Sequence, residues 1–201
     1  MAPTRNNLTN NMEQIRQYFE HAIQQKISEK EWIFFVSKLS RQEFPKKHII
    51  LKTGQIEDYL SFVEMGIVRY YIPKLENDLT FTFVFDNNFV SGYDSFLTRK
   101  PSTYCIETLT KTTLWRLSYT DLQTIYNETK IGNLIGRQAS ASLFLKKSKR
   151  ELSLLNETAE QRYRNLFTEQ PHLIQHIPLK YIASYIGVTP QALSRIRKRI
   201  Y

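Results

Sequence analysis

The polar side chains with the most specific spacing in this chain lie close to its end. They are Thr189, Gln191, Ser194, Arg195 and Lys198. Amide and guanidinium groups, as on Gln191 and Arg195, can pair with the edges of nucleic-acid bases, whereas hydroxyl and ammonium groups can contact phosphate. Residues three and four apart share one face of a helix, so a helix that begins near Thr189 would present the other four side chains together. The pattern therefore predicts a helix that reads DNA.

Such a helix needs a partner helix and a tight turn before it, and residues 177–201 contain the signals for both. Ala183 is small enough for close helix packing, and Gly187 can adopt the positive φ that the turn requires. Thr189 is a favourable N-cap, and Pro190 suits the first helical position. The apolar residues that would close a three-helix core are Ile182, Ile186, Val188, Leu193 and Ile196. These signals predict a helix-turn-helix; the alternative is a helical hairpin whose basic face is merely solvated.

The positive charge of the chain is concentrated at the same end. The 201 residues carry a formal net charge of +9. From Lys146 onward there are eleven Lys or Arg against four Glu, a balance of +7 over the last 56 residues, and no acidic residue follows Glu169. A basic segment on a nearly neutral remainder indicates a polyanionic partner, and the helix pattern favours double-stranded DNA.

The chain lacks the characteristic motifs of several other classes of protein. The chain has no P-loop, G-x-S-x-G, H-E-x-x-H or Cys/His cluster, so we expect no enzyme, no catalytic residues, no metal site and no cofactor. The scattered histidines are His21, His48, His172 and His176. The single cysteine, Cys105, excludes an internal disulfide and suits a reducing cytosol. No apolar run is long enough for a membrane span or a secretory signal, so we expect a cytoplasmic protein without a membrane partner.

Residues 44–119 follow the two-residue period that is typical of β-strands. The β-rich runs are HIIL (48–51), YLSFVEM (59–65), IVRYYI (67–72), LTFTFVF (79–85), YCIETL (104–109) and TTLWRLS (112–118). Many short strands separated by Gly, Pro and Asp-Asn turns predict an antiparallel barrel or sandwich. The interior of such a barrel either holds one small ligand or is filled by its own side chains.

A long helix is predicted after the strands. Small, polar and apolar residues between positions 131 and 155 repeat at alternating spacings of three and four, as in a coiled-coil seam. The seam consists of Ile131, Leu134, Gln138, Ala141, Leu145, Ser148, Leu152 and Leu155. We expect this helix to pair with its twin in a homodimer; the alternative is that it lies buried on its own barrel.

The remaining signals divide the chain. Two short helices are expected near the start, one from Met12 and one capped by Ser28 with Glu31. Thr158 with Gln161 predicts a capping box for a helix over 159–169, in which Tyr163 and Phe167 face inward. The predicted domains are therefore a sensor domain over 1–130, a dimerisation helix over 131–155 and a DNA-binding domain over 156–201.

This order of elements resembles the Crp/Fnr family of bacterial transcription regulators. The resemblance covers the chain from about Lys38 onward, looks most like the Bacteroidetes-type branch, and rests on three segments: FPKKHIILKTGQIEDYLSFVEMGIVRYY (44–71), FVSGYDSFLTRKPSTYCIETLT (89–110) and IASYIGVTPQALSRI (182–196). It implies an α+β fold with an N-terminal antiparallel β-roll of the cyclic-nucleotide-binding kind, a long dimerisation helix and a C-terminal helix-turn-helix.

The resemblance also implies function. It implies a homodimer that binds a palindromic operator, responds to a small-molecule effector and has RNA polymerase as a further candidate partner. In the family, the positions that match Gln191 and Arg195 read base edges, and those that match Thr189 and Ser194 lie at phosphate or at the groove.

The effector pocket departs from the family pattern. Its candidate residues, by the resemblance, are Gly92, Tyr93, Ser102 and Thr103. Cyclic-nucleotide binders of the family have a Gly-Glu pair here, followed by an Arg beside a small polar residue. Tyr93 replaces that Glu, Ser102 replaces that Arg, and Arg99 and Lys100 are shifted along the sequence. The cluster cysteines of the oxygen-sensing branch are also missing, so we expect an unknown effector other than cyclic AMP.

Two interpretations of function remain at this point. One is a DNA-binding regulator with a sensory β-roll. The other is a ligand-binding sensor module whose basic C-terminal region docks on a protein partner or an anionic surface. Binding to DNA fragments would separate them.

Overall fold

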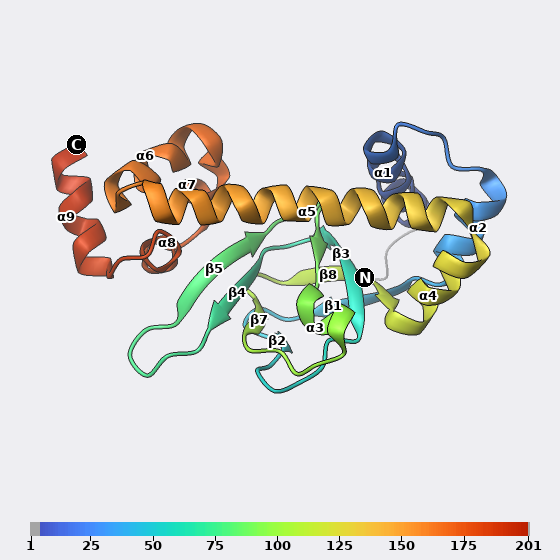
Figure 1. The fold of residues 1–201 in the computed structure, drawn as a ribbon, viewed down its shortest axis with the longest axis horizontal. Helices are drawn as coiled ribbons and strands as arrows, with labels where there is room; N and C mark the ends of the chain where they lie inside the picture. Colours follow the sequence, from blue (N-terminus) through green and yellow to red (C-terminus); the bar gives the residue numbers. More distant parts are fainter. Residues whose placement is uncertain (1–4, 201) are drawn as a thin grey trace. The chain divides into compact units, whose positions relative to one another are not determined.

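A computed structural model describes the backbone of residues 5–200 and the side chains of residues 12–200. The chain combines helices with two β-sheets (Figure 1). It divides into two compact units, which we describe separately. One contains the described residues up to Arg69 together with Phe83–Ser142, and the other contains Tyr70–Thr82 together with the described residues from Leu143 onward. The three predicted domains, over 1–130, 131–155 and 156–201, stay a prediction.

Two helices precede the strands, as predicted. They are α1 (Arg5–Ile23) and α2 (Glu29–Ser37), so α1 begins seven residues before the predicted start at Met12. Ser28 caps α2 because its hydroxyl accepts the Glu31 amide at 3.3 Å and donates to the Glu31 carboxylate at 2.7 Å. The polar sequence before Met12 has no apolar period, which is why the sequence did not indicate the first two turns of α1.

The strands form two four-stranded sheets, which confirms the antiparallel β-roll. The first sheet has the order β1 (Ser40–Phe44), β8 (Thr112–Ser118), β3 (Tyr59–Met65) and β6 (Phe89–Val90). The second has the order β2 (Ile49–Leu51), β7 (Cys105–Thr108), β4 (Val68–Ile72) and β5 (Leu79–Val84). All six predicted strands are present. The sequence did not predict β1 and β6, because SRQEF is polar and FV spans only two residues.

Aromatic side chains dominate the core of the first unit. Phe62 from β3, Trp115 from β8 and Phe96 from α3 (Tyr93–Thr98) are buried there together with Phe19 and Phe35 of the first two helices. A fully buried Phe contributes roughly 1.5–3 kcal/mol relative to an exposed one. The N-terminal helices are thus an integral part of this core.

Helix α4 (Tyr119–Glu128) leads into α5 (Lys130–Asn156), which covers the predicted long helix. A Cβ on Gly132 would lie 2.8 Å from the Ile125 carbonyl oxygen, so only glycine permits this close approach of the two helices. Ile131 is buried in the core. Farther along α5 the leucines of the seam are exposed in the single chain: Leu145 is 66%, Leu152 54% and Leu155 74% exposed.

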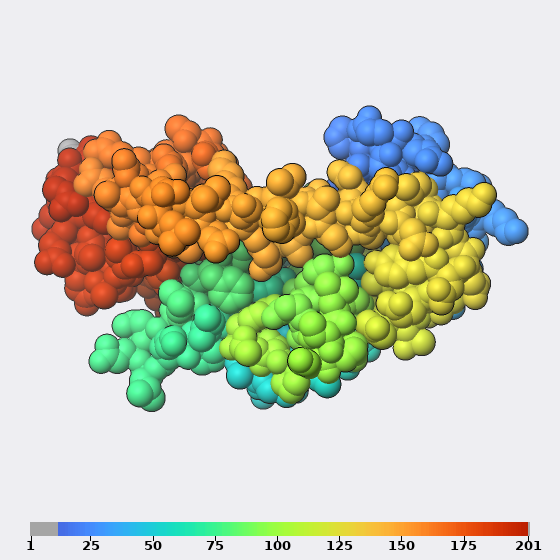
Figure 2. Space-filling model, viewed as in Figure 1, coloured from blue at the N-terminus to red at the C-terminus, as the bar shows by residue number. Residues whose placement is uncertain are grey.

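The second unit ends in four helices, which pack into one block in Figure 2 (orange to red). They are α6 (Ala159–Glu169), α7 (Pro171–His176), α8 (Leu179–Tyr185) and α9 (Pro190–Ile200). The capping box of Thr158 and Gln161 is present as predicted, and Tyr163 is buried. The prediction for Phe167 was wrong: Leu166, 4% exposed, takes the inward position, and Phe167 is 37% exposed.

Candidate functional site

The predicted helix-turn-helix consists of α8, a four-residue turn and α9. The turn begins with a Schellman motif, in which the Val188 amide donates to the Ala183 carbonyl at 2.9 Å and the Gly187 amide donates to the Ser184 carbonyl at 3.1 Å. Gly187 has φ +83°, the left-handed conformation predicted for it. Ala183 and the predicted core residues of both helices are buried, except Val188, which is only half-buried.

The start of α9 also agrees with the prediction from the sequence. The Thr189 hydroxyl accepts the Ala192 amide at 3.2 Å, and the Thr189 carbonyl accepts the Leu193 amide at 3.0 Å. Pro190 occupies the first helical position, where its missing N–H leaves no hydrogen bond unmade. Local signals therefore fix both the turn and the first residue of α9.

Gly187→Ala is expected to lower the free energy of unfolding by about 1–2 kcal/mol, because a Cβ is strained at positive φ. Space is not the limit: the atom nearest to the added methyl would be a guanidinium nitrogen of Arg162 at 3.7 Å. Urea unfolding measures the loss. Gly187→Asn is the control, since asparagine tolerates this conformation better and should lose less. An alanine variant as stable as the parent would show that the turn relaxes.

All five candidate DNA-binding residues, Thr189, Gln191, Ser194, Arg195 and Lys198, are exposed. The last four share one side of α9, opposite the buried Leu193 and Ile196. The side chain of Thr189 is at the N-terminus of the helix, where its hydroxyl caps the first turn. Among the described residues, no ion pair engages Arg195 or Lys198, so both cations can meet a ligand.

Other cations near this face are partly neutralised. Arg199 donates to the Glu160 carboxylate at 3.0 Å, and Arg164 donates to the same group at 3.0 Å. These hydrogen bonds, that from Arg199 foremost, hold the pKa of the Glu160 carboxyl below its usual value. Arg199 thus ties the end of α9 to α6, which separates its role from those of Arg195 and Lys198.

The structure adds two cations, Lys180 and Arg197, that the sequence pattern did not single out. Lys180, Ser194 and Arg197 line a hollow of about 120 Å³ between α8 and α9, together with Leu179, Pro190 and Leu193. Two cations and a hydroxyl in one hollow suit a phosphate group. Lys180 lies on α8, nine residues before Thr189, so the period of α9 alone could not identify it.

The effector-pocket candidates lie where β6 meets α3 and in the loop before β7. Gly92 is buried, and its amide donates to the Glu57 carboxylate at 3.1 Å. Glu57 also accepts the Tyr59 amide at 3.0 Å. Burial raises the pKa of the Glu57 carboxyl above its usual value, although these hydrogen bonds act in the opposite direction. A Cβ at Gly92 would lie 2.5 Å from the Leu51 side chain, which explains the glycine.

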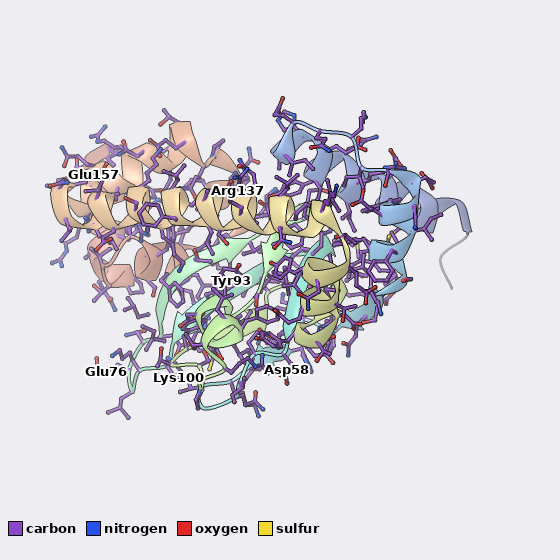
Figure 3. All side chains as sticks on the ribbon, turned by 45° about the vertical axis from the view of Figure 1, so that its right-hand side comes forward. Asp58, Glu76, Tyr93, Lys100, Arg137 and Glu157 are labelled. Carbon is purple, nitrogen blue, oxygen red and sulfur yellow. The ribbon has the colours of Figure 1, made fainter. Side chains whose placement is uncertain are left out.

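Tyr93 points from α3 toward α5 rather than into the sheets. Its hydroxyl lies 3.2 Å from the Ser140 hydroxyl of α5, and its ring stacks on Phe96. Figure 3 shows Tyr93 close to α5, whereas Asp58 and Lys100 lie farther from that helix. Tyr93 therefore links the start of α3 to the long helix.

The other two candidates differ in exposure. Ser102 is buried, and its hydroxyl donates to the Tyr104 carbonyl at 2.9 Å. Its backbone is also engaged, because the Ser102 amide donates to the Gln55 carbonyl at 2.8 Å and its carbonyl accepts the Gly54 amide at 2.8 Å. Thr103 is exposed. The structure thus places Gly92 and Ser102 in the interior and Thr103 on the surface.

The two cations of this segment, Arg99 and Lys100, differ in their contacts. Arg99 donates to the Glu57 carbonyl at 2.7 Å, forms an ion pair with Asp58 and stacks on the Tyr119 ring at 4.4 Å. Lys100 is exposed. A cation that the sequence pattern missed, Arg69, is buried in β4, where its Nε lies 2.7 Å from the Glu107 carboxylate. Both Arg99 and Arg69 therefore have an acidic partner close by.

Two kinds of feature, a metal-ligand cluster and a membrane-spanning helix, are absent from the part of the chain that the structure describes. Within it, no group of three or more His, Cys, Asp or Glu residues is arranged to hold a metal ion. Across the same residues, no helix combines the length and the apolar character that a bilayer crossing needs.

The fold and the sites together define a class of protein: a β-roll of the cyclic-nucleotide-binding kind, continued by a long helix into a helix-turn-helix. Residues 41–129 match the family of the cyclic nucleotide-binding domain. The order of elements, from β-roll to helix-turn-helix, is that of the Crp/Fnr fold of transcriptional regulators. Among proteins of curated function, no sequence matches the chain.

Solved structures support the fold. A Crp/Fnr-family protein from Eubacterium rectale is 18% identical, with a TM-score of 0.69 over 86% of this chain and 83% of that one. The c-di-GMP-responsive global regulator CLP of Xanthomonas campestris is 18% identical, with a TM-score of 0.66 over 86% and 91%. The catabolite activator protein of Thermus thermophilus is 20% identical, with a TM-score of 0.55 over 89% and 86%. At these identities the likeness concerns the fold.

Proposed function

We propose that this chain is a DNA-binding transcriptional regulator, not an enzyme, that acts as a homodimer on an inverted repeat. The observation that carries the proposal is the exposed side of α9, where amide, hydroxyl and cationic groups follow one another on a helix fixed by its own cap and turn. The net charge of the last 56 residues supports a polyanionic ligand.

The side chains of this surface have distinct roles in the proposal. Gln191 and Arg195 reach base edges in the major groove, where an arginine fork pairs with guanine and an amide pairs with adenine. Thr189, Ser194 and Lys198 contact phosphates, and the hollow lined by Lys180 and Arg197 receives a neighbouring phosphate. Such a dimer binds half-sites about one helical turn, ~10 bp, apart.

Selection from a random double-stranded DNA library tests the proposal. The full chain is expected to enrich one inverted repeat and to bind it with an affinity that falls steeply with salt, because phosphate contacts release counterions. Recovery of random sequences with no enrichment would contradict the proposal. It would favour the alternative, in which the basic C-terminal region docks on a protein or an anionic surface.

Arg195→Ala and Lys198→Ala should have different effects. Loss of a guanidinium fork is expected to cost roughly 1–3 kcal/mol on the selected site and to relax preference at one base pair, most simply a G·C pair. Loss of the ammonium group should weaken binding to all sequences alike and reduce the salt slope by about 1. Titrations on the selected and a scrambled duplex measure both. Equal losses on the two duplexes for Arg195→Ala would show that Arg195 contacts phosphate instead.

The proposal extends to the remaining partners. The β-roll is the sensory part, and its effector is a small molecule other than cyclic AMP. RNA polymerase is a further candidate partner of a regulator of this kind, and the cytoplasm is its expected location. Identification of any small molecule that copurifies with the chain, by native mass spectrometry, tests the sensory role directly.

A further inference from the structure

The last two residues of α8 and the C-cap residue that follows them are held by three different segments of the second unit. The Ser184 hydroxyl binds the backbone of residues 78–80, in the hairpin between β4 and β5. The Tyr185 carbonyl accepts a hydrogen bond from Arg150 of α5, whose guanidinium stacks on the Tyr185 ring at 4.1 Å. The Ile186 carbonyl accepts Arg162 Nε of α6 at 2.9 Å.

The contact with the hairpin differs from the other two because it joins elements that are far apart in the sequence. The Ser184 hydroxyl donates to the Asp78 carbonyl at 2.6 Å and accepts the Thr80 amide at 2.7 Å. One hydroxyl therefore engages a donor in β5 and an acceptor directly before this strand, 104 and 106 residues away. Figure 1 shows α8 beside this hairpin.

The position of β5 explains why such a contact is needed. It is the last strand of its sheet, so the outer edge of β5 lacks a neighbouring strand. Thr80 is buried, and a buried backbone amide without a hydrogen bond is destabilising. The Ser184 hydroxyl takes the place that the next strand would occupy, so α8 completes the edge of the sheet.

We infer that Ser184 is a positioning residue for DNA binding: by completing the β5 edge, it fixes the orientation of the helix-turn-helix on the β4–β5 hairpin. The inference rests on the proposed function. Because α8 and α9 share one core, a fixed α8 also fixes the reading side of α9. In a dimer, the orientation of each reading helix sets the spacing between half-sites that both helices can occupy together.

Ser184→Ala tests the inference on two readouts. The hydrogen exchange of the Thr80 amide, followed by NMR, should accelerate about tenfold or more, because its acceptor is gone. On the inverted repeat selected by the wild-type chain, affinity should fall about tenfold, while insertion or deletion of one base pair between half-sites should penalise the variant less than the wild type. Affinity for a scrambled duplex should stay unchanged, since the cations of α9 are intact.

One intermediate variant and one matched control complete the test. Ser184→Cys keeps the shape of the side chain but bonds more weakly, so its exchange rate and spacing profile should lie between those of the wild type and Ser184→Ala; it also serves if the alanine variant fails to fold. Ser37→Ala is the matched control, because it likewise removes a hydroxyl bound to a backbone carbonyl, that of Phe34 at 2.7 Å. It should leave Thr80 exchange and spacing preference at wild-type values.

The outcomes separate the inference from the proposed function. A wild-type chain that enriches no DNA sequence overturns the proposed function and the inference with it. A wild-type chain that binds its site while Ser184→Ala keeps the wild-type spacing profile, or binds more tightly, overturns the inference alone. Unchanged Thr80 exchange in Ser184→Ala overturns it as well, because the contact would then not hold the hairpin.

Discussion

Replacement of both Leu145 and Leu152 by glutamate is expected to convert the proposed homodimer into a monomer. Both leucines are exposed on α5 in the single chain. Two-fold pairing of this helix would bring each position close to its own copy, so the variant would bury four carboxylates without partners, at several kcal/mol per ion. Light scattering at micromolar concentration measures the mass. A wild-type monomer, or a variant that remains dimeric, would contradict the role of the seam.

The same substitution should reduce DNA affinity far more than any single change on α9. A monomer contacts one half-site, and loss of the second contact removes a factor of roughly 10²–10⁴ in affinity. Ala139→Glu combined with Lys147→Gln is the matched control, since it changes the net charge by the same −2 at exposed positions outside the seam. The control should remain dimeric. If it dissociated too, charge alone and not the apolar contact would explain the result.

The exposed apolar surface of α5 is wider than the heptad pattern indicated. Phe144 and Leu154 are also exposed, next to the seam residues. The predicted seam had a polar middle, with Gln138 and Ser148, and Phe144 lies directly before Leu145 on the adjoining side of the helix. We therefore expect Phe144 to add to the contact between copies.

The helix-turn-helix was predictable because its signals are local. A left-handed Gly187, the Thr189 cap and the Pro190 start each depend on a few neighbouring residues, and the structure shows all three. The six predicted strands were identifiable for the same reason, since alternation is visible within one run of sequence. The prediction that Phe167 faces inward was wrong by one residue, because Tyr163 and Leu166 continue the buried side of α6 at a spacing of three.

The contacts around the effector-pocket candidates Gly92 and Ser102 were not predictable. Glu57 reaches the Gly92 amide across 35 residues, and Arg99 reaches the Glu57 carbonyl across 42. Such pairs depend on how the strands and α3 pack, which no local pattern shows. The sequence indicated which family residues were missing at Tyr93 and Ser102, but not which groups of this chain would engage the segment instead.

Cyclic AMP is expected to bind this protein at millimolar concentration or more weakly. By the resemblance to the Crp/Fnr family, residues 92–103 are the segment expected to hold the phosphate, and they lie within the residues 41–129 that match the cyclic nucleotide-binding domain. A phosphate taken out of water needs a cation, for which arginine is suited because its planar fork gives two hydrogen bonds. This segment offers Ser102, whose hydroxyl already donates to the Tyr104 carbonyl, and Thr103, which is exposed.

The nearby cations do not replace the missing arginine. Arg99 is engaged with the Glu57 carbonyl and Asp58, and Lys100 is exposed. The buried carboxyl of Glu57 already accepts the Gly92 amide, so an incoming phosphate would compete with it for that donor. Removal of one partner from a buried charge pair costs roughly 3–5 kcal/mol. At about 1.4 kcal/mol per factor of ten, this loss changes a micromolar ligand into a millimolar one.

Calorimetric titration of the full chain with cyclic AMP measures this expectation. Because the chain is strongly basic, any anion can bind weakly, and 5′-AMP is therefore the control. Equal, weak binding of both nucleotides is the expected result, with no change in affinity for the selected DNA. A dissociation constant near ten micromolar or tighter for cyclic AMP alone would show that Arg99 or Lys100 turns inward on binding. An accompanying rise in DNA affinity would identify cyclic AMP as the effector, against the prediction made from Tyr93 and Ser102.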